Sequence, residues 1–98
     1  MKVFTQSVNF NADNELIKLV ETKVSSLIKF HDKIVDAEIF LKVFNTSDKE
    51  NKRTEVKINI PGRELIIKRE AKTFEEGVNS AVDNLKRQLK RSKEKQRD

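Results

Sequence analysis

The sequence predicts an α+β domain of two layers, with the element order βαβββα and a four-stranded sheet. Two segments, residues 35–44 and 53–60, alternate between apolar and polar side chains, which is typical of strands with one buried face. Two others, residues 14–30 and 74–89, carry their apolar side chains on a single helical stripe. Because each helix has only one apolar face, we expect both helices to cover the same side of the sheet.

The N-terminal part of the chain is expected to form a strand and then a helix. Residues 2–8 alternate weakly, with Val3 and Thr5 on one face. Asp13 fits the N-cap of the helix over 14–30, because its carboxylate can accept hydrogen bonds from the free amides of the first turn. The apolar stripe of this helix consists of Leu16, Ile17, Val20, Val24, Leu27 and Ile28.

The middle of the chain is expected to form three strands in an antiparallel meander. A polar hairpin loop over 45–52 follows the strand over 35–44, and Pro61-Gly62 marks a turn before a last strand over 64–71. The first two strands, joined through a helix, should pair in parallel with a right-handed crossover. The inward-facing side chains are Val35, Ala37, Ile39, Leu41 and Val43 in one strand and Thr54, Val56, Ile58 and Ile60 in the next.

The second helix is expected to begin with a capping box. Thr73 takes the N-cap and Glu76 the third helical position, so each side chain can satisfy an amide of the other. Gly77 in the first turn costs up to about 1 kcal/mol against Ala, and the sequence shows no gain for it. The apolar stripe consists of Phe74, Val78, Ala81, Val82, Leu85 and Leu89.

Length and composition limit the class of protein. A chain of 98 residues fits one domain, and the absence of Cys excludes disulfides and thiolate metal sites. No signal-peptide core and no apolar run of about 18 residues is present, so we expect a cytoplasmic chain without membrane contact. With a pI near 9.6, the chain should prefer an anionic partner.

The excess positive charge is confined to residues 85–98. This stretch has seven basic and two acidic residues, a net +5, which equals the charge of the whole chain. Residues 1–84 therefore hold fourteen residues of each sign. If the helix continues past Leu89, it should leave the core there, with residues 90–98 as a basic extension into solvent. Its cations would form two neighbouring stripes, Lys86, Lys90, Lys93 and Arg97 in one and Arg87, Arg91 and Lys95 in the other.

The basic stretch and the outer face of the sheet each allow two interpretations. The basic stretch could be a frayed, solubilising tail, or it could bind the phosphates of a nucleic acid through counterion release. On the outer face of the sheet, Phe4, Phe40 and Phe44 lie among cations and could stack on bases, or could simply shield the sheet. The sequence has no set of residues spaced like a catalytic or metal site, and His31 beside Asp32 is expected at the surface. We therefore do not expect an enzyme.

Two stretches carry a family resemblance. After the first helix the chain has FHDKIVDAEIFLKV, with an aromatic-x-Asp-basic-Ile run at residues 30–34. The second helix ends in RQLKRSKEK, residues 87–95. With the βαβββα order, these resemble the short form of the ribosome hibernation promoting factors, the family that includes ribosome-associated inhibitor A and sigma-54 modulation protein. Ser92 stands where relatives often have His, and Asn84 where they often have a basic residue.

The resemblance implies a fold similar to that of double-stranded-RNA-binding domains and a role in stopping translation in stationary phase. Members bind the small ribosomal subunit between head and body and block messenger RNA and transfer RNA. The partner implied is ribosomal RNA, with no cofactor or small-molecule substrate, and the chain is expected to be a monomer off the ribosome. RNA-binding residues carried over from the family are Lys23, Lys33, Lys42, Arg87, Arg91, Lys93 and Lys95. The helical stripe adds Lys86 and Lys90.

Two other functions stay open on the sequence alone. A general double-stranded-RNA-binding module would use the same fold and bind any A-form duplex of about 16 base pairs. A protein–protein adaptor would use the outer face of the sheet and leave the basic stretch idle.

Overall fold

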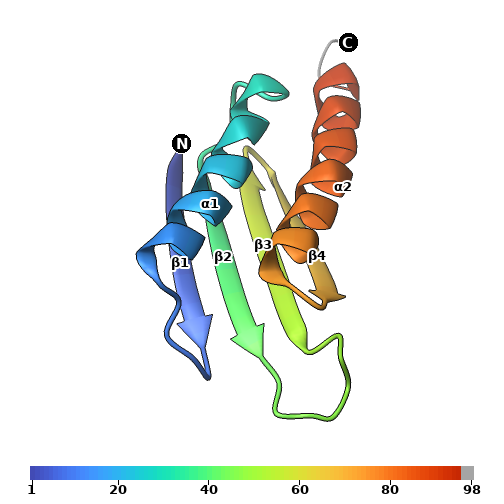
Figure 1. Ribbon diagram of the computed structural model, residues 1–98. Coiled ribbons are helices and arrows are strands. Elements are labelled where there is room, and N and C mark those ends of the chain that lie inside the picture. The colour runs from blue at the N-terminus through green and yellow to red at the C-terminus, as the bar shows by residue number, and fades with distance from the viewer. Residues whose placement is uncertain (96–98) are drawn as a thin grey trace.

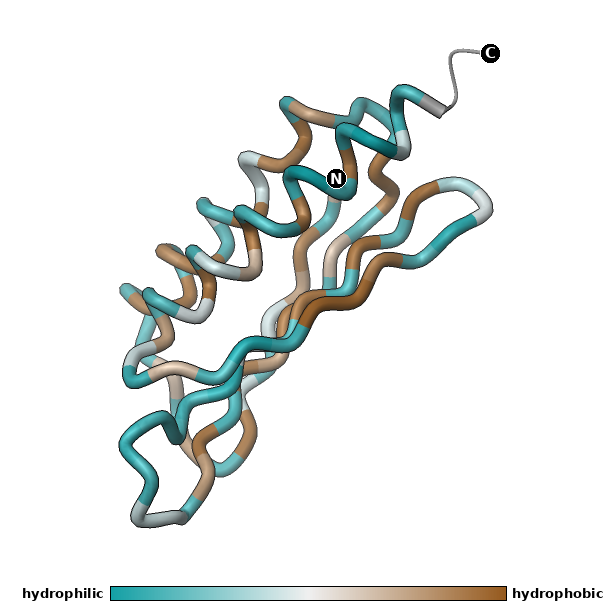
Figure 2. The backbone as a smooth tube through the Cα atoms, turned by 90° about the vertical axis from the view of Figure 1, so that its right-hand side faces the viewer, coloured by the Kyte–Doolittle hydropathy of each residue, from teal (hydrophilic) through white to brown (hydrophobic). Residues whose placement is uncertain are grey.

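The computed structural model describes residues 1–95 and has the predicted two-layer βαβββα architecture. The sheet has the order β1-β2-β3-β4, with β1 and β2 parallel and the other neighbours antiparallel. Both helices lie on one side of this sheet (Figure 1), and the view from the side shows the two layers (Figure 2). The elements are β1 (Lys2–Val8), α1 (Asn14–Ser25), the 3-10 helix η1 (Ser26–Lys29), β2 (Asp36–Val43), β3 (Lys52–Ile60), β4 (Arg63–Ala71) and α2 (Phe74–Lys95).

The core lies between the helices and the sheet and is formed by the predicted apolar stripes. The predicted inward faces of the second and third strands are confirmed for Ile39, Leu41, Val56 and Ile58, which are fully buried. The prediction is wrong for Val35, which precedes β2 and is 58% exposed. The helices contribute Val20, Val24 and Leu27 from α1 and η1, and Phe74, Val78, Ala81, Leu85 and Leu89 from α2. Within residues 1–95, no helix combines the length and apolar character needed to cross a membrane.

Both predicted helix starts are confirmed by their caps. The Asp13 carboxylate accepts a hydrogen bond from the Leu16 amide at 2.8 Å, and the Thr73 hydroxyl accepts one from the Glu76 amide at 3.1 Å. These caps fix where α1 and α2 begin, at the end of the sheet where the β2–β3 loop also lies (Figure 1). Both helices run toward the opposite end, where α2 extends past the β3–β4 turn (Figure 1).

The prediction of one α-helix over residues 14–30 is wrong at its end. The α-helix stops at Ser25, and the next four residues wind as the tighter η1. The Ser26 hydroxyl donates to the Lys23 carbonyl at 2.6 Å, which satisfies one of the carbonyls left free at this terminus. Because a 3-10 helix turns further per residue, Ile28 leaves the buried stripe and is 40% exposed.

Two expectations for polar residues are also wrong. His31, expected at the surface, is fully buried, because the segment after η1 folds under the end of α2. The stripe on α2 does not leave the protein at Leu89, since Ser92 one turn later is only 6% exposed. The small side chain of Ser92 lets the helix stay close to the rest of the domain at this point. Of the predicted extension over 90–98, residues 96–98 lie outside the described part.

Gly77 is explained by the close approach of α2 to β3. A Cβ atom at this position would lie 2.7 Å from the Thr54 hydroxyl oxygen, below any normal contact distance. The Thr54 hydroxyl is itself buried, and within residues 1–95 it has no hydrogen-bond partner. The first turn of α2 can pack this closely on β3 only if residue 77 has no side chain. The low helix propensity of Gly is accepted in exchange for this close packing.

We predict that Gly77→Ala destabilises the fold, although Ala is the better helix former by about 1 kcal/mol. Overpacking against Thr54 should cost more, leaving a net loss of about 1–2 kcal/mol in the free energy of unfolding. Urea denaturation of Gly77→Ala, Thr54→Ala and the double variant measures the coupling. In the Thr54→Ala background the hydroxyl is gone, so the cost of Gly77→Ala should shrink. Equal costs in both backgrounds would contradict this explanation.

Candidate nucleic-acid interface

The predicted cations of α2 gather around an aromatic ring from another element. Phe30, directly after η1, lies half-buried with its ring beneath two ammonium groups. The Nζ atoms of Lys86 and Lys90 lie 4.8 Å and 5.2 Å from the ring centroid, within cation–π range. Lys93 lines the same hollow with Phe30 and Lys90. We call these four residues the Phe30 cluster.

Lys33 belongs to the same end of the molecule, through its contact with His31. The Lys33 amide donates to Nδ1 of His31 at 3.1 Å, so this imidazole is neutral and unprotonated at Nδ1. Burial lowers the pKa of His31 below its usual 6.5, Asp32 opposes this, and the charges of Lys93 and Lys33 lower it further. Both lysines therefore lie near one imidazole, although they come from different segments of the chain.

Lys23 lies on the flank of α1 that faces α2. On the other flank, Glu21 accepts a hydrogen bond from Thr5 of β1 at 2.8 Å, which fixes that side toward the β1 edge. Lys23 follows two residues later, roughly 200° around the helix. It is half-buried in the last turn of α1, where a cation suits the negative end of the helix dipole.

The remaining predicted cations of α2 lie outside the Phe30 cluster. Arg87 is exposed and pairs with Asp83 one turn earlier at 3.1 Å, a surface pair that holds the side chain only weakly. Arg91 lies on the flank of α2 toward β4, in a hollow with Arg63. Lys95 is the last residue of α2, and its side chain falls outside the described part of the structure.

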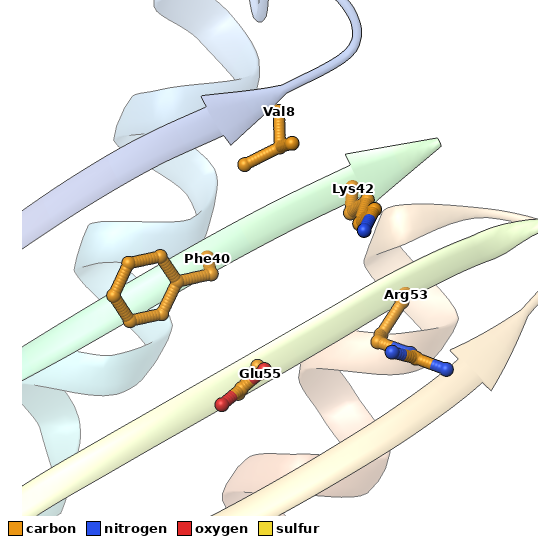
Figure 3. A pocket seen from close by; sticks show the side chains of 5 residues that line it. All are labelled: Val8, Phe40, Lys42, Arg53 and Glu55. Carbon is orange, nitrogen blue, oxygen red and sulfur yellow. The ribbon is translucent and has the colours of Figure 1, made fainter. Parts of the chain in front are cut away.

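The structure separates Lys42 from all of these residues. Lys42 lies on the outer face of the sheet, which the helices do not cover (Figure 3). Its ammonium group lies 5.0 Å from the ring centroid of Phe44, and the Arg53 guanidinium lies 4.5 Å from the same centroid. Lys42 and Arg53 also line a hollow of about 290 Å³ with Phe40, Val8 and Glu55. A partner that contacted both Lys42 and the Phe30 cluster would have to extend around the domain.

The outer face of the sheet is electrically balanced. In register across the four strands, five basic and five acidic side chains point to this face. Several are paired, with Arg53 and Glu70 at 2.6 Å and Lys57 at 3.5 Å from both Glu38 and Glu64. The Phe44 ring is already covered by cations, and Phe4, 54% exposed, stands apart from it. This face therefore offers a polyanion no net attraction. Its charged residues are Lys2, Lys42, Arg53, Lys57, Lys68, Asp36, Glu38, Glu55, Glu64 and Glu70.

Sequence reasoning missed two residues that help to shape the cationic end of the domain, the end where the cations of the second half of α2 lie. Phe30 begins the aromatic-x-Asp-basic-Ile run, but its contact with Lys86 and Lys90 joins segments that are distant in the sequence. Arg63 could have been found, because alternation with Leu65 and Ile67 places it on the helix side of β4. Its pairing with Ile60 fixes it at the end of the sheet where α2 passes.

The arrangement suits the binding of phosphates. Lysine side chains from α2 and from the segment after η1 lie at one end of the domain, while the outer face of the sheet is neutral. Within residues 1–95, no group of three or more His, Cys, Asp or Glu side chains is placed to hold a metal ion. A one-sided cationic end on a neutral body is the electrostatic pattern of a protein that binds a nucleic-acid backbone.

Comparison with known proteins gives a family and confirms the fold. The model of the family described as "Sigma 54 modulation protein / S30EA ribosomal protein" matches residues 3–97. Two proteins of Pseudomonas putida named ribosome hibernation promoting factor are 28% identical over 96 residues, covering 98% of this chain and 90% of theirs.

Two solved structures share the architecture. The Protein Y N-terminal domain of Thermus thermophilus is 23% identical, with a TM-score of 0.79 over 93% of this chain and 98% of that one. A ribosomal subunit interface protein from Coxiella burnetii is 20% identical, with a TM-score of 0.79 over 95% and 98% of the two chains. At these identities the likeness concerns the fold alone, and it agrees with the order predicted from the sequence.

We predict that His31 makes stability fall in mild acid. The folded state holds the pKa of His31 below 6.5, so the unfolded chain binds the proton more readily, and stability is lost as pH drops below about 6.5. The chain has one His, so few other groups titrate there. In His31→Asn, whose side-chain oxygen can accept from Lys33, urea unfolding at pH 5.5–7.5 should show a flatter dependence. The same slope in both proteins would contradict the prediction.

Proposed function

Because the chain belongs to the family of sigma-54 modulation proteins and S30EA ribosomal proteins, we propose that it is a ribosome-associated hibernation factor. It binds the small ribosomal subunit in the channel between head and body and excludes messenger RNA and transfer RNA there when growth stops. The observation that carries this proposal is the Phe30 cluster, a supported group of cations on one end of an otherwise neutral domain. The name of the Pseudomonas relatives supports a ribosomal partner.

The proposed mechanism is occlusion, and it requires no chemical step and no cofactor. Lys86, Lys90 and Lys93 lie on one flank of a helix that is packed onto the domain as far as Ser92. Phosphates of ribosomal RNA bind these side chains and release their counterions, which gives binding a steep dependence on salt. The folded body then occupies the space that messenger RNA and transfer RNA need. The protein acts as a monomer in the cytoplasm until it meets a ribosome.

The neutral face of the sheet complements this role. A domain cationic all round would bind any RNA in many orientations, whereas charge on one end orients the domain on the ribosome. Lys42 on the sheet face and Lys23 and Lys33 near α1 are expected to contribute less than the α2 cations. Lys42 already contacts Phe44, and Lys23 is half-buried.

We predict that Lys86→Gln/Lys90→Gln binds small subunits at least tenfold more weakly than the native chain at about 0.1 M salt. Loss of two phosphate contacts should lower the slope of log affinity against log salt by about 1.5–2. The measurement is co-sedimentation with purified small subunits over a range of salt concentrations.

The matched control is Lys2→Gln/Lys68→Gln, which removes two exposed lysines from the outer face of the sheet. It has the same change in charge and should bind like the native chain. Equal losses in both variants would mean that only net charge matters. A random RNA duplex of about 16 base pairs, added as competitor, separates this proposal from a general duplex-binding module, because such a module would be displaced from the ribosome.

We predict that Phe30→Leu weakens binding about two- to fivefold, corresponding to the 0.5–1 kcal/mol typical of an exposed cation–π contact, while all charges remain. The ring holds two ammonium groups in place, and without it the lysines must be ordered on binding. Because the number of phosphate contacts stays the same, the salt slope should not change. An affinity equal to that of the native chain would show that the ring does not position the lysines.

A further inference from the structure

A second cationic hollow lies on the flank of α2 opposite the Phe30 cluster. It has a volume of about 320 Å³ and is lined by Arg63 from the start of β4 and by Asn84, Gln88 and Arg91 from α2. We call these four residues the arginine notch. Arg63 reaches it because β4 places this residue on the helix side, in register with Ile60 at the end of the sheet. Two consecutive turns of α2 supply the other three residues.

The lining of the arginine notch is suited to an oxyanion. Its lining has two cations and no carboxylate, whereas four other hollows of residues 1–95 each contain Asp or Glu. Within residues 1–95, neither Arg63 nor Arg91 forms an ion pair. Both guanidinium groups are exposed and keep their planar set of N–H donors for a ligand.

The two amides of the notch are oriented by a hydrogen bond between them. Nε2 of Gln88 donates to Oδ1 of Asn84 at 2.6 Å, one turn away. This contact occupies the acceptor oxygen of Asn84 and leaves its NH₂ group, together with the second N–H of Gln88, as donors. The notch therefore combines two guanidinium groups with neutral amide donors. Such a set of N–H donors is suited to the oxygens of a phosphate.

We propose that the arginine notch binds a phosphate of an RNA backbone, and that α2 is held on both flanks by two separate backbone segments. This inference rests on the proposed function and adds to it a second contact with its own residues. An α-helix with its side chains is about 10–12 Å across, so the Phe30 cluster and the notch cannot share one phosphate. The deep major groove of A-form RNA is too narrow to take such a helix. Two strands that are brought together by RNA tertiary structure can satisfy both flanks.

The test compares Arg63→Gln/Arg91→Gln with the control Arg69→Gln. Arg69 is on the same strand and the same side of the sheet, but it contacts Ser80 in the first half of α2, away from the cationic end. In co-sedimentation with small subunits, the double variant should bind about ten- to a hundredfold more weakly, with a salt slope lower by about 1.5–2. Arg69→Gln should bind like the native chain. Circular dichroism melts establish that all variants are folded.

The outcomes separate this inference from the proposed function. Binding of Arg63→Gln/Arg91→Gln equal to that of Arg69→Gln, with Lys86→Gln/Lys90→Gln impaired, overturns the notch and leaves the proposed function standing. Full binding by both double variants overturns the function itself. Losses that add when the two pairs are combined support two independent contacts.

A last arm distinguishes RNA from a free phosphate ion as the ligand. Inorganic phosphate is titrated at constant ionic strength while the side-chain amide signals of Asn84 and Gln88 are followed by NMR. Shifts that saturate, together with ribosome binding that does not depend on Arg63 and Arg91, would assign the notch to a free ion and overturn the RNA contact. Loss of ribosome binding in the variants, without saturation by inorganic phosphate, supports the RNA backbone.

Discussion

The packing of the second half of α2 onto the segment after η1 is the contact on which the cationic end depends. Leu89 and Ser92 keep the helix against the domain, and His31 is buried at the same end. With the helix fixed there, Phe30 lies below Lys86 and Lys90 and limits where their ammonium groups can go. A free lysine loses up to about 2 kcal/mol of side-chain entropy when it is immobilised. Each lysine held over the ring has already lost part of that freedom before any ligand binds.

The distribution of charge follows from the same architecture. The sheet alternates, so its outer face could accept charge at every second position, and there the two signs cancel across neighbouring strands. The first turn of α2 is acidic, with Glu75 and Glu76 at the positive end of the helix dipole, and the cations come in its last three turns. The helix dipole thus stabilises the charged side chains at both ends of α2. As a result, negative and positive charge lie at opposite ends of this helix. A polyanion is attracted to one end only.

Much of the fold could be predicted from the sequence, because alternation, helical stripes and caps are local signals. The strands, the two helix starts and most of the core needed only neighbouring residues. The errors arose where distant segments meet. Nothing near His31 shows that α2 will cover it, and a serine such as Ser92 at the end of an apolar stripe does not by itself show that the packing continues. For the candidate site, the cations of α2 were predictable, whereas the role of Phe30 and the separation of Lys42 required the tertiary arrangement.

The position of the cations on two flanks of α2 bears on the selectivity of the proposed RNA contact. A row of lysines on one flank could follow any backbone, since phosphates carry no sequence information. The Phe30 cluster and the proposed arginine notch face away from each other, with the helix between them. A ligand that satisfies both must present two backbone segments about a helix diameter apart. A regular duplex does not offer such a gap to a helix, but a folded RNA with a channel does, so the spacing of two simple charge contacts can select a shape.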